Sequence, residues 1–326
     1  MLRNIRVTPL AAESMGVRSM CALVGTPDVK ILLDAAASLG PSRWGLPPHP
    51  REYQALTECR ERISNAAEKA DVVTISHYHF DHHTPSFTDW FCNWSSAAIA
   101  EEIYEHKVVL AKNPRSMINH GQRRRGWMFR RTAGKLAKKL EIADGRVFEF
   151  GDTKLKFSQP VFHGIRNTSL GWVLMVTIDY SNERMMYTSD VEGPMYNPTL
   201  EMIRGEAPDF LIIGGPPLYL VEFKVDETHV QRGMKNLEKL VRSIPTTILE
   251  HHILRDGNWR AACQPIFAAA SKKGHNILTA AESLGKENNL LECRRKELFE
   301  AEPPDSDFKK WMKLPHSERK EIRPPI

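Results

Sequence analysis

The sequence predicts an α/β protein, and three observations support this fold class. Apolar runs rich in β-branched residues recur along both halves of the chain, and segments of helical period separate them. The chain has 326 residues, of which 41% are hydrophobic, so it can bury a large core. Histidines and aspartates close several of the apolar runs, and α/β proteins place their sites at strand ends.

The first part of the chain predicts a hairpin, a helix and a buried strand. Residues 19–25 and 29–35 are apolar runs separated by Thr26-Pro27-Asp28, which indicates a turn between two strands. Residues 47–71 begin as a Pro-rich loop and continue as an amphipathic helix. The run that follows, over residues 71–77, predicts a strand that ends on His77.

The second part of the chain repeats this scheme. Strands are predicted at residues 154–163, 172–180, 184–190, 209–215 and 246–252, and helices at about 227–243 and 258–273. We expect one domain over residues 1–300, with a basic helical insertion at about residues 107–141. Residues 301–326 are expected to form a charged, Pro-rich C-terminal tail.

Composition excludes several classes of protein. The five cysteines are odd in number, scattered and never in a C-x-x-C pair, which argues against a disulfide framework or a zinc ribbon and fits a cytoplasmic protein. The N-terminus has no apolar signal segment, and glycines and prolines at 214–217 interrupt the longest apolar stretch. We therefore expect no membrane partner, and the sequence leaves a homo-oligomer open.

A dense histidine cluster is the main functional signal. The segment TISHYHFDHHTP places His77, His79, His82 and His83 around Asp81. His163, Asp190 and the adjacent pair His251 and His252 close later strands, so the fold can bring all of them to one rim. Imidazole and carboxylate donors suit zinc, iron or manganese, and the absence of nearby cysteine argues against a closed structural zinc site.

The order of these residues resembles the metal motifs of the metallo-β-lactamase-fold superfamily. More narrowly, AAESMGVRSM, SLGPSRWGLPPHPRE, SHYHFDHHTP and LEHHILRD resemble the archaeal UPF0282 group of predicted metallo-hydrolases. This resemblance implies an αββα four-layer sandwich over the domain at 1–300. It also implies two divalent transition-metal ions, with zinc expected first and iron or manganese as alternatives.

The resemblance assigns a role to each residue of the set. His77, His79 and His163 would hold the first metal; Asp81, His82 and a late histidine would hold the second; and Asp190 would bridge both. Either His251 or His252 could be the late ligand, and we favour His251. Asp34 would hold the histidine-rich loop at residues 77–83 in position through hydrogen bonds.

This ligand set predicts a metal-dependent hydrolase that uses a metal-bridged hydroxide on an ester or phosphoester. Asp81 could orient the hydroxide, and His83 or His229 could protonate the leaving group. Diiron redox relatives resemble H-x-E-x-D, whereas position 79 here is histidine, which favours hydrolysis. A metal-binding or redox protein without hydrolytic turnover is an alternative.

The basic segment bears on the substrate. Residues 112–140 contain ten lysines and arginines and no acidic residue, and Trp127 and Phe129 lie among them. This mixture is typical of surfaces that bind phosphates and stack bases, so a nuclease that holds RNA or DNA through residues 112–140 is a second hypothesis. Because the net charge is only +5, we favour a small anionic substrate.

Overall fold

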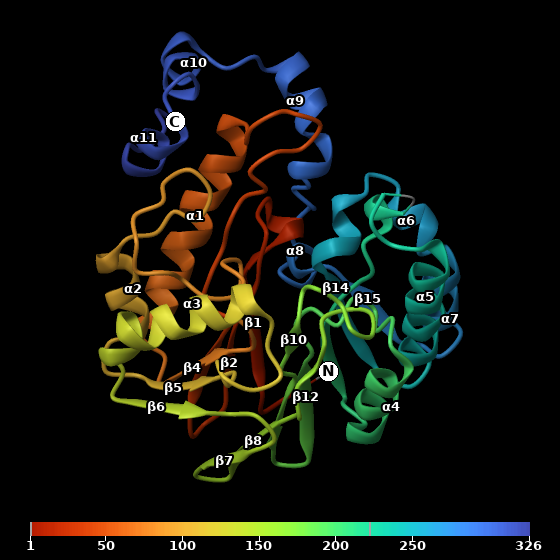
Figure 1. Ribbon diagram of the computed structural model, residues 1–326. Helices are drawn as coiled ribbons and strands as arrows, with labels where there is room; N and C mark the ends of the chain where they lie inside the picture. Colours follow the sequence, from red (N-terminus) through yellow and green to blue (C-terminus); the bar gives the residue numbers. More distant parts are fainter. Residues whose placement is uncertain (1, 222) are drawn as a thin grey trace.

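The computed structural model describes residues 2–221 and 223–326. Two sheets pack face to face and helices cover both outer faces, as Figure 1 shows, so the predicted αββα four-layer sandwich is confirmed. One apolar core lies between the sheets and combines Ile31 and Leu33 of the first sheet with Ile178, Met185 and Ile212 of the second.

The first sheet has the order β1-β2-β3-β4-β5-β6. The predicted hairpin is confirmed, because β2 pairs with β3 in antiparallel fashion on either side of Thr26-Pro27-Asp28. From β3 to β6 the neighbouring strands are parallel. The strands are β1 (Arg6–Ala12), β2 (Met20–Gly25), β3 (Lys30–Leu33), β4 (Val72–Ile75), β5 (Val108–Ala111) and β6 (Lys139–Ile142).

The second sheet has the order β15-β14-β13-β12-β11-β8-β7, and its strands from β12 to β15 are parallel. A separate short pair is formed by β9 and β10. The strands are β7 (Val147–Phe150), β8 (Thr153–Phe157), β9 (Val161–Phe162), β10 (Trp172–Val173), β11 (Val176–Tyr180), β12 (Glu183–Tyr187), β13 (Phe210–Gly214), β14 (Thr246–Glu250) and β15 (Asn276–Leu278).

Helices cover the sheets because their apolar faces match the outward residues of the strands. In β13, Ile212 faces the core between the sheets, whereas Leu211 and Ile213 join a second core with Leu237 and Ile266 of the outer helices. The helices are α1 (Pro50–Ala67), α2 (Ala97–Tyr104), α3 (His120–Arg131), α4 (Asn197–Glu206), α5 (Glu227–Val241), α6 (Trp259–Ala262), α7 (Gln264–Ser271), α8 (Ala280–Ser283), α9 (Arg295–Ala301), α10 (Ser306–Met312) and α11 (His316–Glu321).

The helix predicted within residues 47–71 is confirmed as α1, and its start has a local cause. Pro50 occupies the first turn, and His49 and Glu52 form a capping box in which the Glu52 carboxylate accepts a hydrogen bond of 2.8 Å from the amide of His49. The helix buries Leu56 and Ile63 against the first sheet and its neighbours.

Several predicted segments differ from the structure. The strands expected at 154–163 and 172–180 are each divided, into β8 and β9 and into β10 and β11. The helix expected at about 258–273 is likewise divided, into α6 and α7. The segment at 107–141 is not helical throughout, since it begins with β5, ends with β6 and contains α3 between them. The C-terminal residues fold back over α1, where Phe308 and Trp311 are buried beside Tyr53.

Over residues 2–221 and 223–326, the structure contains no helix of the length and apolar character that crossing a bilayer requires.

Candidate metal centre

The loop that follows β4 carries most of the candidate ligands. The amides of His82 and His83 both donate to the carbonyl oxygen of His79, at 3.0 Å each, which turns the chain back on itself. This turn brings the His77 and His82 rings to 4.3 Å between centroids, although five positions separate them in the sequence. A short extended stretch followed by a turn therefore gathers the donors of one motif.

The first group of donors consists of His77, His79, His163 and Asp190. One ligand atom from each residue lies within 4.8 Å of those of the others. His163 follows β9, and its Nε2 lies 3.1 Å from the Asp190 Oδ2 atom. These are the residues that the resemblance to the metallo-β-lactamase-fold superfamily assigned to a first metal, together with the carboxylate expected to bridge.

The second group consists of Asp81, His82 and His251, again with ligand atoms within 4.8 Å of one another. The Nε2 atom of His251 lies 3.6 Å from Asp81 Oδ2 and 3.4 Å from Asp190 Oδ1. The Nε2 atom of His82 lies 3.2 Å from Asp190 Oδ2. Asp190, which follows β12, thus lies between the two groups.

The two adjacent late histidines point to different neighbours. His251 forms a group with Asp81 and His82, and His252 forms one with His163 and Glu192; both also form a group with Asp190, so the preference for His251 stays a prediction. The Nε2 atom of His252 is 3.8 Å from Glu192 and 3.7 Å from Asp190. His251 is fully buried, and the His252 side chain is 12% exposed.

Asp34 supports the loop in the way the sequence predicted. Its carboxylate accepts hydrogen bonds of 2.8 Å from the amide of Ser76, from the Nδ1 atom of His82 and from the hydroxyl of Tyr187. It also accepts one from the Ser76 hydroxyl. The carboxylate therefore fixes the orientation of the His82 ring from the side opposite Asp190.

Sequence reasoning missed three charged residues beside the donors. Glu192 lies 3.2 Å from the Nδ1 atom of His163, and Glu13 accepts a hydrogen bond of 2.5 Å from Arg255, which also lies 3.3 Å from His251. Their signal was weak: Glu192 stands two positions after Asp190, and Arg255 stands four after His251.

Several residues of the site have a backbone conformation that non-glycine residues seldom adopt. The φ angle is +45° at Asp34, +52° at Ser189, +52° at Glu192 and +67° at His251. Such angles are unfavourable in isolation and cluster at functional sites, where the surrounding structure holds them. Each of these residues follows a strand and turns its chain at the rim.

The donor atoms are suited to a cation. The Nε2 atoms of His77 and His82 and the Oδ1 atom of Asp190 are buried and have no hydrogen-bond partner within the described part of the chain. Buried polar atoms are costly without a partner, and a metal ion placed among them would provide one. The residues present therefore fit a divalent metal.

Burial and neighbouring charges shift the pKa values of these donors in different directions. Burial lowers the pKa of His77 well below its usual range and lowers that of His79 to about 3. Burial acts in the same direction on His163, but the nearby carboxylates of Asp190 and Glu192 outweigh it and raise its pKa to about 10. Although burial opposes it, His251 and His82 hold the pKa of Asp190 well below its usual range. Asp190 is thus an ionised carboxylate that attracts positive charge.

The two proposed proton donors lie outside these groups. His83 is buried against Tyr78 and Phe129, its Nδ1 lies 3.0 Å from the carbonyl oxygen of His79, and burial lowers its pKa to about 3. His229 lies in the first turn of α5, and none of the metal-suited groups found among the described residues contains it. Protonation of a leaving group by either residue stays a prediction.

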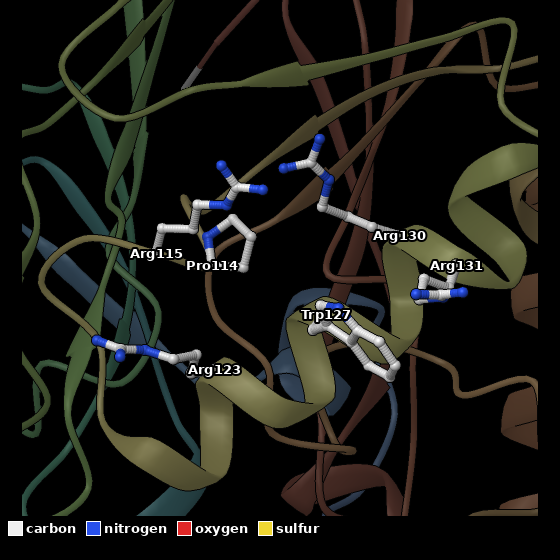
Figure 2. A pocket seen from close by; sticks show the side chains of 6 residues that line it. All are labelled: Pro114, Arg115, Arg123, Trp127, Arg130 and Arg131. Atoms are coloured by element: carbon white, nitrogen blue, oxygen red, sulfur yellow. The ribbon is translucent and has the colours of Figure 1, made fainter.

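The basic segment lies next to this loop. The buried residues Gln122, Gly126 and Phe129 hold α3 against the protein, and the Gln122 side chain is 3.3 Å from the amide of Tyr78. The remaining residues of α3 form two faces, which line separate pockets. Figure 2 shows the face that carries Arg123, Trp127 and Arg130, with Arg115 opposite.

An αββα sandwich with histidine and aspartate groups at the ends of its strands defines a protein of the metallo-β-lactamase fold with a site suited to divalent metal. No protein-family model matches the chain. Among curated proteins, a relative from Methanopyrus kandleri is 45% identical over 294 residues, which cover 90% of this chain and 99% of the relative. Relatives from Sulfurisphaera tokodaii and Korarchaeum cryptofilum are 41% and 36% identical and cover 94% and 99% of their own lengths, and 91% and 94% of this chain. All three are UPF0282 proteins, and the chain belongs to the UPF0282 family.

Solved structures with a similar arrangement are more distant. The metallo-β-lactamase fold protein YhfI from Bacillus subtilis is 14% identical with a TM-score of 0.49, over 85% of this chain and 96% of its own. An isothiocyanate hydrolase from Delia radicum gut bacteria is 14% identical with a TM-score of 0.48, over 81% and 94%. The short form of human tRNase Z is 11% identical with a TM-score of 0.41, over 75% and 91%.

Proposed function

We propose that the protein is a metal-dependent hydrolase that acts on an ester or phosphoester. The observation that supports this most is the position of the Asp190 carboxylate, whose two oxygens lie within 3.4 Å of histidines from both donor groups. His77, His79 and His163 would hold one ion, Asp81, His82 and His251 the other, and Asp190 would bridge them. Zinc is the first candidate, and iron and manganese are alternatives for the same donors.

Each residue has a distinct part in this proposal. Two bound ions of this kind lower the pKa of a shared water and polarise a carbonyl or phosphoryl oxygen of the substrate. Asp81 would accept a hydrogen bond from the attacking water and orient it, and its side chain is 17% exposed, so it faces the open side of the site. Asp34 and Glu192 would hold the rings of His82 and His163 in place.

Metal analysis combined with an activity panel tests the proposal. The purified protein should bind more than one equivalent of transition metal, and zinc-, manganese- or iron-loaded protein should hydrolyse members of a panel of aryl esters, lactones and aryl phosphates. A protein that binds metal but hydrolyses none of these substrates would instead support a metal-binding or redox role.

A second candidate function is that of a metal-dependent nuclease, and one surface favours it. Arg115, Arg123, Arg130, Arg131 and Trp127 line a cleft of about 490 Å³. Within residues 2–221 and 223–326, none of these arginines lies within 4.0 Å of a carboxylate oxygen. Figure 2 shows Arg115 and Arg130 extending toward the same space from two elements. Trp127 is 52% exposed; the Arg131 guanidinium lies over its ring at 4.7 Å from the centroid, and the remaining exposed surface of the ring could stack on a base.

Salt-dependent binding tests this second candidate. Replacing Arg115, Arg123 and Arg130 together with alanine should weaken the binding of single-stranded RNA or DNA of any sequence. It should also flatten the dependence of log K on log salt by roughly 0.7 per lost phosphate contact. Arg124→Ala serves as a matched control, because Arg124 lies on the other face of α3. Absence of oligonucleotide binding by the unmodified protein at moderate salt would exclude this function.

A further inference from the structure

The second face of α3 covers a pocket. One wall of this pocket is formed by the loop that follows β4 and carries the donors His77 to His82. We define the α3 pocket by Phe80 and His83 of the loop, Phe87 of the next segment, and Arg124, Arg125 and Phe129 of α3. Its volume is about 490 Å³, within the usual range for small-molecule sites. Phe80 and His83 flank Asp81 and His82 in the chain, so a ligand in the α3 pocket lies beside the loop that carries the donors.

The walls of the α3 pocket are mainly apolar and aromatic. The ring of Phe80 packs edge-on against Phe87 at 5.3 Å between centroids, and His83 packs edge-on against Phe129 at 6.1 Å. Phe87 and Met128, which also lines the pocket, are each 44% exposed. Large apolar side chains left open to solvent around a concave site are typical of ligand-binding surfaces.

The α3 pocket also contains positive charge that no acidic residue neutralises directly. The Arg125 guanidinium lies 4.4 Å from the centroid of Phe80 and donates to the carbonyl oxygen of Tyr78 at 3.3 Å, which fixes it beside the loop. In the part of the chain that the structure describes, neither Arg124 nor Arg125 has a carboxylate oxygen within 4.0 Å. A half-buried guanidinium held in this way is suited to an anionic group of a ligand.

We propose that the α3 pocket binds the apolar body of an anionic substrate, namely an ester or phosphoester of an aromatic or branched apolar alcohol, whose negative charge pairs with Arg124 and Arg125. This inference rests on the proposed hydrolase function and names the substrate class for that site. The mainly apolar and aromatic walls favour such a substrate over a sugar phosphate, and the volume of about 490 Å³ suits a small molecule.

Gly121 allows the pocket to be filled without disturbing the helix. This residue lines the pocket, and a Cβ atom added to it would meet only the Oδ1 atom of Asn119, at 3.6 Å, among the described neighbours within 4 Å. A Gly121→Phe variant would therefore project its ring into the pocket, while Gly121→Ala leaves the pocket open. The two variants form a matched pair at one position.

Binding of 2-naphthalenesulfonate, an aromatic anion that cannot be hydrolysed here, provides a test that does not depend on turnover. By calorimetry, the unmodified protein and Gly121→Ala should bind it equally, Gly121→Phe should bind it at least tenfold more weakly, and neutral 2-naphthol should bind more weakly than the anion. The Arg124→Ala/Arg125→Ala variant should also lose about tenfold, whereas Arg123→Ala/Arg130→Ala, on the opposite face of α3, should not.

Two results would overturn the inference: undiminished binding by Gly121→Phe, or equal losses from the two arginine pairs. Turnover of 2-naphthyl phosphate separates this inference from the proposed function. Hydrolysis with an unchanged KM in Gly121→Phe would contradict substrate binding in the α3 pocket but would support the proposed hydrolase function. Specific binding of the sulfonate, together with no hydrolysis of any ester or phosphoester, would support the α3 pocket as a ligand-binding site and would contradict the proposed hydrolase function.

Discussion

The Asp190 carboxylate lies within 3.4 Å of histidines from both donor groups. We predict that Asp190→Ala lowers metal content by at least one equivalent and lowers any hydrolytic rate by about 100-fold or more, because in the proposed site Asp190 would hold both ions and its loss would disturb the position of the attacking water. Elemental analysis and kinetics measure these effects, and circular dichroism should show an intact fold.

His229→Ala is the control for this prediction. His229 is a half-buried histidine that lies outside the metal-suited groups formed by the described residues, so its loss should have a much smaller effect on rate and none on metal content. Comparable losses of metal content and hydrolytic rate in Asp190→Ala and His229→Ala, with unchanged circular dichroism, would contradict the assignment of Asp190 as a ligand and of His229 as a residue outside the site.

We expect Asp34 to act on a bound metal through His82, although its carboxylate also forms a metal-suited group with His77 and His82. Since its carboxylate accepts hydrogen bonds from His82, Ser76 and Tyr187, Asp34→Asn should leave the ligand set complete but disorder the His82 ring. We expect about 10- to 100-fold weaker binding of the second metal, the range typical for groups that orient ligands. A competition titration with a chelator measures this, and an unchanged affinity would contradict the role.

The candidate ligands were predictable from sequence, and the residues that orient them were only partly so. His77, His79, Asp81 and His82 form a local motif, and the turn at His79 is short enough to be anticipated. Glu192, Glu13 and Arg255 acquire their role only through contacts across the fold: Arg255 meets Glu13 across 242 positions of the chain. No local pattern encodes such a pairing.

At the scale of single elements, the close packing of α3 against Tyr78 and Pro114 requires a glycine at position 126. A Cβ atom at Gly126 would lie 2.6 Å from a ring carbon of Tyr78 and 2.8 Å from Pro114. We predict that Gly126→Ala destabilises the protein by roughly 1–3 kcal/mol through overpacking, despite a gain of about 1 kcal/mol in helix propensity. Because Tyr78 lies between His77 and His79, metal affinity should fall as well.

Thermal unfolding and a metal titration check this prediction, and Gly121→Ala is the control in the same helix. Its added methyl group meets no close neighbour, so its melting temperature should stay the same or rise. Equal behaviour of the two alanine variants would show that the fit of α3 against Tyr78 does not govern the loop.

The sequence predicted α1 but missed the short strands β5 and β6. The 18 residues of α1 carry a clear apolar face, whereas β5 and β6 have four residues each and lie in a segment dominated by basic charge. The strand expected at 154–163 ends early because Pro160 cannot donate to a ladder, and the amide of Ser158 bonds instead to the carbonyl oxygen of Met175.

At the scale of the whole molecule, the candidate centre joins the two sheets. The loop after β4 belongs to the first sheet, whereas Asp190 and His251 follow β12 and β14 of the second. The sequence predicted that these residues converge but not the pairing of the strands that carry them, since strand order depends on contacts between distant segments. Metal binding and the packing of the sheets are therefore expected to be coupled.

We predict that removing metal with a chelator lowers the melting temperature by several degrees. A ligand that binds only the folded state stabilises it by RT ln(1 + [L]/Kd), which is about 4 kcal/mol when the metal is present at a thousand times its Kd. Differential scanning calorimetry of the metal-loaded and the chelated protein measures the difference. In Asp190→Ala this difference should shrink toward zero, because the residue between the two donor groups is missing.

Trp311→Ala separates this coupling from a general loss of stability. Trp311 is 4% exposed, packs at 5.6 Å between ring centroids against Tyr53, and donates to the carbonyl oxygen of Ile322 at 2.8 Å. Its removal should cost about 3–5 kcal/mol of packing in the C-terminal helices. Because that region does not contain the donor groups, the metal-loaded and the chelated protein should lose the same number of degrees. A Trp311→Ala variant that abolished the metal-dependent shift, or an Asp190→Ala variant that retained it, would show that stability and the candidate centre are not linked through Asp190.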